Sequence, residues 1–186
     1  NTASTLQIDE NSTSVGTLSV SDIDNDQTTL SLTGTDATSF NLSSSNGLSF
    51  KTAPDYETKT SYYLTLSVTD GQVTVTKDIT IAVTNLNDNI PSITSLASNT
   101  VPEFQTAVFN VTATDADGDT VSYSLSGTNA ALVSIDSSSG LVRLNSAADY
   151  EARTSYSVIV TASDGTNSSS QTITISVIND TFDDLV

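Results

Sequence analysis

Two kinds of acidic cluster stand out in the sequence, and each occurs twice. One is a run of alternating aspartates, Asp22-Ile23-Asp24-Asn25-Asp26, which returns as Asp115-Ala116-Asp117-Gly118-Asp119. The other places two carboxylates around a tyrosine, as Asp55-Tyr56-Glu57 and Asp149-Tyr150-Glu151. These clusters fall between strand-like segments, so alternate carboxylates can point into one cavity. Oxygen ligands in that arrangement suit a hard divalent cation such as Ca²⁺.

A polar stretch from Thr84 to Pro91 lies near the middle of the chain. It follows an alternating apolar run, Ile79 to Val83, which predicts a strand with one buried face. Four residues of the stretch carry side-chain oxygens suited to calcium: Asn85, Asn87, Asp88 and Asn89. We predict that residues 85–91 form a linker between two domains and that calcium sets its shape.

The composition excludes several classes of function. The chain of 186 residues has no Cys and no His, which excludes disulfides, thiolate or imidazole metal sites and the usual nucleophile–base pairs. Its net charge of −17, from 22 acidic and 5 basic residues, repels nucleic acid and anionic membranes. No apolar run approaches the roughly 20 residues that cross a bilayer. No stretch resembles a secretory leader, so we expect a mature protein or an excised fragment.

The two halves of the chain repeat one another. Glu10 and Glu103, like Asp22 and Asp115, are 93 positions apart, whereas the Asp-Tyr-Glu motifs and the Asp70-Gly71 and Asp164-Gly165 pairs are 94 apart. Order and spacing hold over nearly the whole length, which chance would not give. We therefore predict two homologous domains, 1–90 and 91–186.

Each half has the pattern of an all-β domain. Short alternating segments separated by turn residues indicate about seven strands, which predicts a two-sheet β-sandwich in each half. One segment predicted as a strand is Val15 to Val20. Residues of one parity in the longest strands should face the core: Tyr62, Leu64, Leu66, Val68, Ile79, Ile81 and Val83.

Some of the acidic residues have an ordinary explanation. We interpret Asp26, Asp36 and Asp119 as turn residues, because Asp favours turns through its own side chain. Turn chemistry gives no reason for Glu10 or Glu57, or for an Asn-Asp-Asn run before proline. Those residues favour a metal site.

Together these motifs resemble those of tandem cadherin repeats. They include Asp9-Glu10-Asn11, Pro102-Glu103-Phe104, the two Asp-Tyr-Glu motifs, the linker, the second aspartate run and Ala162-Ser163-Asp164-Gly165, all in the family's order. The resemblance implies an all-β fold of two tandem seven-stranded Greek-key β-sandwiches, of the cadherin or immunoglobulin type, in an extended end-to-end arrangement. It also implies three calcium ions at the junction. Their implied ligands are Glu10, Asp55, Glu57, Asn85, Asn87, Asp88, Asp115, Asp117 and Asp164 through side chains, and Leu86, Asn89 and Ser124 through backbone oxygens.

The sequence also departs from that family's pattern. Asn85 stands where the family usually has Asp, which implies weaker or altered binding of one ion. Near the C-terminus Phe182 falls where a counterpart of Asp88 is expected. Two outer clusters are therefore expected as half-sites of unknown occupancy: Asp22, Asp24 and Asp70 in the first domain, and Glu103, Asp149 and Glu151 in the second.

The resemblance implies an extracellular, calcium-rigidified spacer or adhesion module that contacts neighbouring repeats and associates homophilically. The Cys-free, Ser/Thr/Asn-rich composition looks like that of bacterial surface or secreted adhesins. A carbohydrate-binding module is the alternative, with Tyr63 and Tyr123 as candidate aromatic platforms. Asp55 and Glu57 could form a glycosidase acid–base pair, but their repetition argues against an enzyme.

Overall fold

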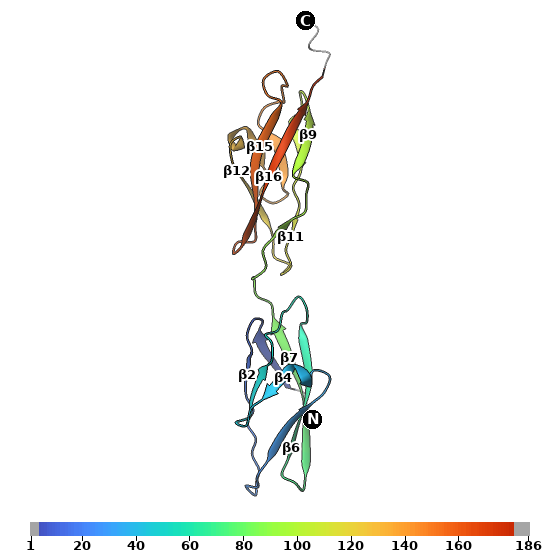
Figure 1. Ribbon diagram of the computed structural model, residues 1–186, viewed down its shortest axis with the longest axis vertical. Helices are drawn as coiled ribbons and strands as arrows, with labels where there is room; N and C mark the ends of the chain where they lie inside the picture. Colours follow the sequence, from blue (N-terminus) through green and yellow to red (C-terminus); the bar gives the residue numbers. More distant parts are fainter. Residues whose placement is uncertain (1–3, 181–186) are drawn as a thin grey trace. The chain divides into compact units, whose positions relative to one another are not determined.

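The computed structural model describes residues 4–180, and they form an all-β structure, as predicted. The chain divides into two compact units, Asn1–Leu86 and Asn87–Val186 (Figure 1). The only helical turns among the described residues are two short 3₁₀ helices, η1 (Ala37–Ser39) and η2 (Ala130–Leu132). No helix in this part of the chain has the length and apolar character needed to cross a membrane.

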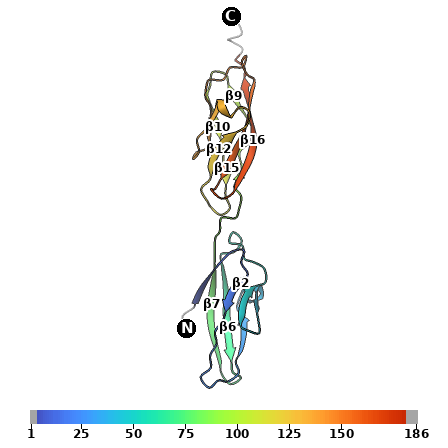
Figure 2. The ribbon, with the colours of Figure 1, turned by 90° about the vertical axis from the view of Figure 1, so that its left-hand side faces the viewer.

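The first unit contains two sheets (Figures 1 and 2). In the four-stranded sheet the spatial order is β1 (Ser4–Asp9), β7 (Thr74–Thr84), β6 (Ser61–Thr69) and β3 (Thr29–Thr33). Strand β1 runs parallel to β7, whereas the other neighbours are antiparallel. The three-stranded sheet has the order β2 (Ser14–Thr17), β5 (Gly47–Phe50) and β4 (Phe40–Leu42).

The second unit repeats this arrangement. Its four-stranded sheet has the order β12 (Ser122–Ser126), β15 (Ser155–Ser163), β16 (Ser168–Ile178) and β9 (Ser98–Pro102), with β9 parallel to β16. Its three-stranded sheet has the order β10 (Ala107–Asn110), β14 (Leu141–Leu144) and β13 (Val133–Ile135).

The second unit also contains a small antiparallel pair, β8 (Ser92–Ile93) with β11 (Ala113–Thr114). In the first unit the positions equivalent to β11 are Val20 and Ser21, which are not in a strand. The prediction of a strand from Val15 to Val20 was therefore wrong at its end, because β2 stops at Thr17.

Alternation along the long strands places the core as predicted. Ile79, Ile81 and Val83 of β7 are buried, and so are Leu64 and Leu66 of β6. Burial of each such side chain contributes roughly 1.5–3 kcal/mol. This core fixes the ends of the strands, where the acidic loops begin.

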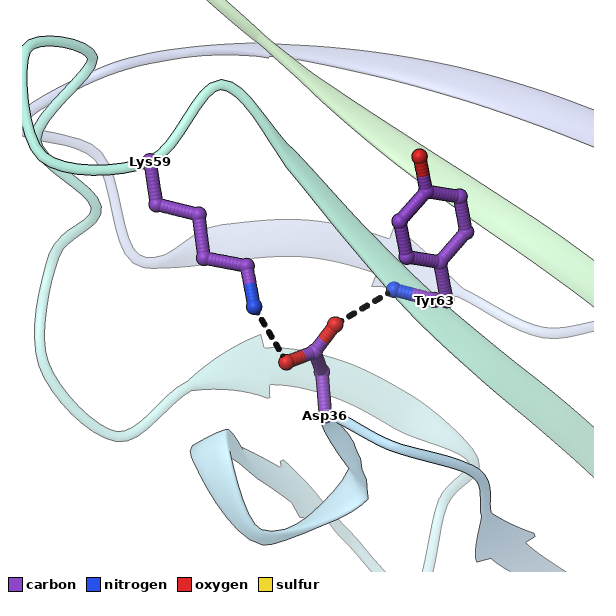
Figure 3. A network of polar contacts seen from close by, with 3 residues as sticks. All are labelled: Asp36, Lys59 and Tyr63. Atoms are coloured by element: carbon purple, nitrogen blue, oxygen red, sulfur yellow. Dashed lines mark hydrogen bonds and ion pairs between the residues drawn. The ribbon is translucent and has the colours of Figure 1, made fainter.

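A buried carboxylate holds η1 to β6 (Figure 3). Asp36 accepts a hydrogen bond of 2.8 Å from the Tyr63 backbone N–H and forms an ion pair with Lys59. Burial raises the pKa of Asp36, but the bonds from Lys59 and Tyr63 and the charge of Lys59 outweigh it, and the pKa lies below its ordinary value. The sequence predicted only a turn residue here.

The second unit makes the same backbone contact with a neutral side chain in place of the Asp36 carboxylate. Asn129 stands at the position equivalent to Asp36, and its Oδ1 accepts a hydrogen bond of 2.8 Å from the Ser157 N–H. Arg153 replaces Lys59, and its guanidinium lies over the Tyr156 ring, as Lys59 lies over Tyr62. A neutral acceptor is therefore sufficient for the backbone contact at this position.

We predict that Asp36→Ala destabilises the first unit by about 1–3 kcal/mol, mainly because the Tyr63 N–H loses its acceptor. Lys59 is 40% exposed, so solvent screens its charge and limits its share of the loss. Asp36→Asn should cost less than about 1 kcal/mol because it restores the arrangement of Asn129. Urea unfolding followed through NMR signals of the first unit measures both.

The pH dependence provides the control. The pKa of Asp36 is lower in the folded state than in the unfolded state, so its contribution is fully present above about pH 4 and is lost as the pH falls through the folded pKa. In Asp36→Asn the free energy of unfolding of the first unit should fall less steeply as the pH is lowered below about 4. An unchanged slope would contradict this role.

Candidate metal centre

In the first unit, Glu10 connects three segments that are distant in sequence. It follows β1 directly, is 3% exposed, and donates its backbone N–H to the Thr84 carbonyl at the end of β7. Its Oε2 accepts a hydrogen bond of 2.8 Å from the Tyr56 N–H, and its Oε1 accepts one of 2.7 Å from the Leu86 N–H. A carboxylate oxygen of Glu57 lies within 4.8 Å of one of Glu10.

Glu103 occupies the same position in the second unit. It is 4% exposed and accepts hydrogen bonds from the Asp180 N–H at 3.0 Å and the Tyr150 N–H at 2.5 Å, and these bonds lower the pKa of Glu103. Carboxylate oxygens of Glu103, Asp149 and Glu151 lie within 4.8 Å of one another. The structure therefore brings together the three residues that the sequence predicted as an outer half-site.

Asp55 lies differently from Glu10 and Glu57. Its Oδ2 accepts a hydrogen bond of 2.9 Å from the Thr58 hydroxyl and its Oδ1 one of 3.2 Å from the Thr58 N–H, and these bonds lower the pKa of Asp55. The counterpart Asp149 accepts the Ala152 N–H at 2.8 Å. A lowered pKa suits a carboxylate ligand and does not suit a general acid.

The second aspartate run forms a compact loop after β11. Asp115 Oδ1 accepts the backbone N–H groups of Asp117 and Asp119, at 3.0 and 3.3 Å. One carboxylate oxygen from each of these three residues lies within 4.8 Å of the others. The sequence predicts Asp119 only as a turn residue, because its spacing alone does not show that its carboxylate lies in this cluster.

Asp117 also binds the part of the linker that belongs to the second unit. Its Oδ2 accepts the N–H groups of Asp88 and Asn89 at 3.1 and 2.9 Å, and its Oδ1 accepts the Asn89 side-chain amide at 2.7 Å. Asn167 donates its side-chain amide to Asn87 Oδ1 at 3.1 Å and to the Asn89 carbonyl at 3.2 Å. No motif in the sequence predicts that Asn167 binds the linker.

Asp164 completes this group of loops. Its Oδ1 accepts the N–H groups of Thr166 and Asn167 at 2.7 and 2.6 Å. Burial raises the pKa of Asp164, but these backbone bonds, together with the nearby side-chain amides of Asn87 and Asn167, outweigh it and lower the pKa.

Two carboxylate oxygens of the second unit are buried and have no hydrogen-bond donor among the described residues. They are Asp115 Oδ2 and Asp164 Oδ2. Burying a charged oxygen without a hydrogen-bond partner costs free energy. Such an atom therefore indicates that a further ligand, such as a cation, binds there. A calcium ion satisfies carboxylate oxygens of this kind, so these residues fit the cation that the sequence predicted.

The remaining predicted residues are located as follows. Asp22 and Asp70 repeat the loop bonds of Asp115 and Asp164: Asp22 Oδ1 accepts the N–H groups of Asp24 and Asp26, and Asp70 Oδ1 accepts those of Gln72 and Val73. Ser124 lies in β12 opposite Thr161, and its carbonyl stays a predicted ligand. Asn85 follows β7 directly. Phe182 lies outside the described residues.

Comparisons with known proteins agree with this architecture. Residues 97–178 match the sequence model of the Cadherin domain. Chitinase A of Pseudoalteromonas piscicida is 34% identical over 159 residues, which cover 84% of this chain and 19% of that protein. Cadherin-23 of Mus musculus is 33% identical over 160 residues, which cover 81% of this chain and 5% of that protein. The chain thus spans a small part of these relatives.

Solved structures show the same fold. Human protocadherin-24 EC1-2 (form II) gives a TM-score of 0.80 at 24% identity, covering 95% of each chain. Mouse cadherin-23 EC22-24 gives a TM-score of 0.81 at 22% identity, covering 98% of this chain and 65% of that one. The chain is therefore built of cadherin-like repeats, as its motifs predicted.

We predict that Asp117→Asn lowers calcium affinity about tenfold or more, because it removes the charge of one ligand while keeping an acceptor for Asn89. Asp136→Asn is the matched control. Asp136 also accepts two backbone N–H groups in a turn of the second unit, but it is not in the acidic clusters described above. Isothermal titration calorimetry with Ca²⁺ compares the two. Equal losses of affinity would contradict the assignment.

Proposed function

We propose that this chain is a calcium-binding pair of cadherin-like repeats that serves as a stiffened spacer or adhesion module of an extracellular protein. The observation that carries the proposal is the pair of buried, donor-free oxygens of Asp115 and Asp164, in loops that also bind the linker. Each repeat would be a Greek-key β-sandwich, and residues 85–91 would supply ligands from the connection between them.

Charge explains how calcium would act on such a pair. The proposed junction gathers seven carboxylates, and their mutual repulsion opposes any close arrangement without a cation. About three calcium ions, the number that the resemblance implies, would add six positive charges and share ligands from both repeats. These carboxylates are Glu10, Asp55, Glu57, Asp88, Asp115, Asp117 and Asp164.

Binding of calcium to the folded chain would also raise its stability through linkage, by about 2.7 kcal/mol at a hundredfold excess over Kd. The ligand contributed by Asn85 is an amide where the family usually has a carboxylate, so one ion of the set is proposed to bind more weakly than the others. The proposed partners are neighbouring repeats of the same kind, and a second copy in homophilic association.

We predict that millimolar Ca²⁺ makes the chain longer and stiffer in solution than excess EDTA does. Small-angle X-ray scattering measures the maximum dimension and the flexibility of the monomer, and sedimentation measures its mass. Glu57→Ala and Asp117→Ala should abolish the calcium response. Asp136→Ala should keep it, because Asp136 lies in a turn of the second unit and is not in the clusters.

The outcomes separate the possible roles. A calcium-dependent change of shape at constant mass supports the spacer. A calcium-dependent dimer supports homophilic adhesion. No change of shape or mass would overturn the proposed calcium junction.

A second candidate is an accessory carbohydrate-binding module of a secreted bacterial enzyme, favoured by the match to Chitinase A. Tyr63 is 57% exposed and could form a platform. Tyr123 does not suit this role, since it packs against the core and its hydroxyl accepts the Ala113 N–H at 2.9 Å. Pull-down on chitin with and without calcium tests this candidate, and Tyr63→Ala should abolish any retention.

A further inference from the structure

The first unit has a small open pocket beside its Asp-Tyr-Glu loop, with a volume of about 400 Å³. Sites for small molecules in proteins have volumes of this order. Side chains from η1, from the end of β5, from the loop after β5 and from β6 line the pocket. They include Ser39, Phe50, Thr52, Asp55, Thr58 and Tyr62.

Aromatic side chains form the apolar part of this lining. The rings of Phe50 and Tyr62 meet edge to face, with their centroids 4.8 Å apart. Phe40 packs against both rings, at centroid distances of 4.2 and 5.8 Å, and Lys59 lies over the Tyr62 ring. The rings hold one another in place, so a ligand that packed against them would not have to order them.

Hydroxyls and a carboxylate form the polar part of the lining. Thr58 orients Asp55, because its hydroxyl and its backbone N–H donate to the two carboxylate oxygens at 2.9 and 3.2 Å. Each of these oxygens has room for a further donor, and the Thr58 hydroxyl can still accept a hydrogen bond. Ser39 and Thr52 add hydroxyls that can both donate and accept. The pocket therefore combines an aromatic wall with several hydrogen-bonding groups.

The second unit has the same backbone here but different side chains. Leu132 of η2 takes the position of Ser39, since its carbonyl accepts the Asn145 N–H as the Ser39 carbonyl accepts the Lys51 N–H. The other lining positions also differ: Leu144 replaces Phe50, Ser146 replaces Thr52 and Ala152 replaces Thr58. The second unit thus lacks the ring at the end of the strand and two of the three Ser or Thr hydroxyls, which makes it an internal control.

We propose that this pocket binds one pyranose residue of a neutral glycan. The C–H face of a pyranose packs against the aromatic wall, and its hydroxyls exchange hydrogen bonds with Ser39, Thr52 and Asp55. A wholly apolar ligand would leave these polar groups without partners. An anionic sugar would be repelled by Asp55 and by the net charge of −17.

This inference rests on the second candidate function, carbohydrate binding, and it places the sugar at a site other than Tyr63. It does not rest on the calcium junction. Asp55 is also a proposed calcium ligand, so the test is done in EDTA, which keeps the two roles apart. Failure of the test would leave the calcium-dependent change of shape untouched.

The test is a titration of the full chain with the methyl glycosides of glucose, galactose, mannose and N-acetylglucosamine, followed through the backbone amide signals by NMR. At least one of these glycosides should shift the amides of Thr52 and Thr58, with a dissociation constant on the order of 10 mM or below. The amides of Ser146 and Ala152 should not move. Methyl glucuronide, the anionic probe, should bind at least about tenfold more weakly than the best neutral glycoside.

Two variants locate the binding. Ser39→Leu fills the pocket with the side chain that the second unit accommodates as Leu132, and it should weaken binding about tenfold or more. Ser44→Leu places the same side chain on an exposed residue outside the lining and should leave the affinity unchanged. The proposal is overturned if no glycoside shifts the amides of the pocket, if the two variants bind equally, or if methyl glucuronide binds as well as the neutral glycosides.

Discussion

A buried glutamate at the end of the first strand of each unit is the contact on which the rest of the site depends. Glu10 binds the N–H groups of Tyr56 and Leu86, and Glu103 binds those of Tyr150 and Asp180. One carboxylate thus joins the start of the sheet, the Asp-Tyr-Glu loop and the segment that leaves the last strand. A buried charge is stable only with such bonds, so the three segments and the glutamate require one another.

The loops of Asp115 and Asp164 are also held by hydrogen bonds from backbone N–H groups to a carboxylate, but these bonds reach only one of the two carboxylate oxygens. Asp115 and Asp164 each give one oxygen to two backbone N–H groups, which fixes the loop, and leave the other oxygen without a donor. These hydrogen bonds account for the loop geometry, and the second oxygen of each carboxylate is available to a cation. A site of this kind would be preorganised for a cation, because binding would not have to order the loop and would compensate the buried charge.

Much of the fold and of the candidate site could be predicted from the sequence, because strands, turns and the repeated carboxylates have recognisable local patterns. The core residues Ile79, Ile81 and Val83, the loop positions of the acidic residues and the duplication at 93 or 94 positions all depend on local patterns. What could not be read depends on contacts between distant segments. Two examples are the ion pair between Asp36 and Lys59 and the hydrogen bond from Asn167 to Asn87. Each joins residues that no short motif connects. Val15 to Val20 looked like one strand because its pattern continues, whereas a strand also requires a partner.

The residues of the linker, 85–91, are continuous in sequence, but each is held by one unit or by the other. Leu86 is held by Glu10 of the first unit, whereas Asn87 and Asn89 are held by Asn167 of the second. Pro91, which reads as the end of a polar linker, is fully buried in the second unit, because the β8 segment that it opens completes that unit's core. The linker is thus anchored within one unit or the other almost residue by residue. The anchoring changes between Leu86 and Asn87, which is where the chain divides into its two units. In the proposed calcium junction, the Leu86 carbonyl and Asp88 come from opposite sides of this boundary, so a cation that bound both would couple the two units.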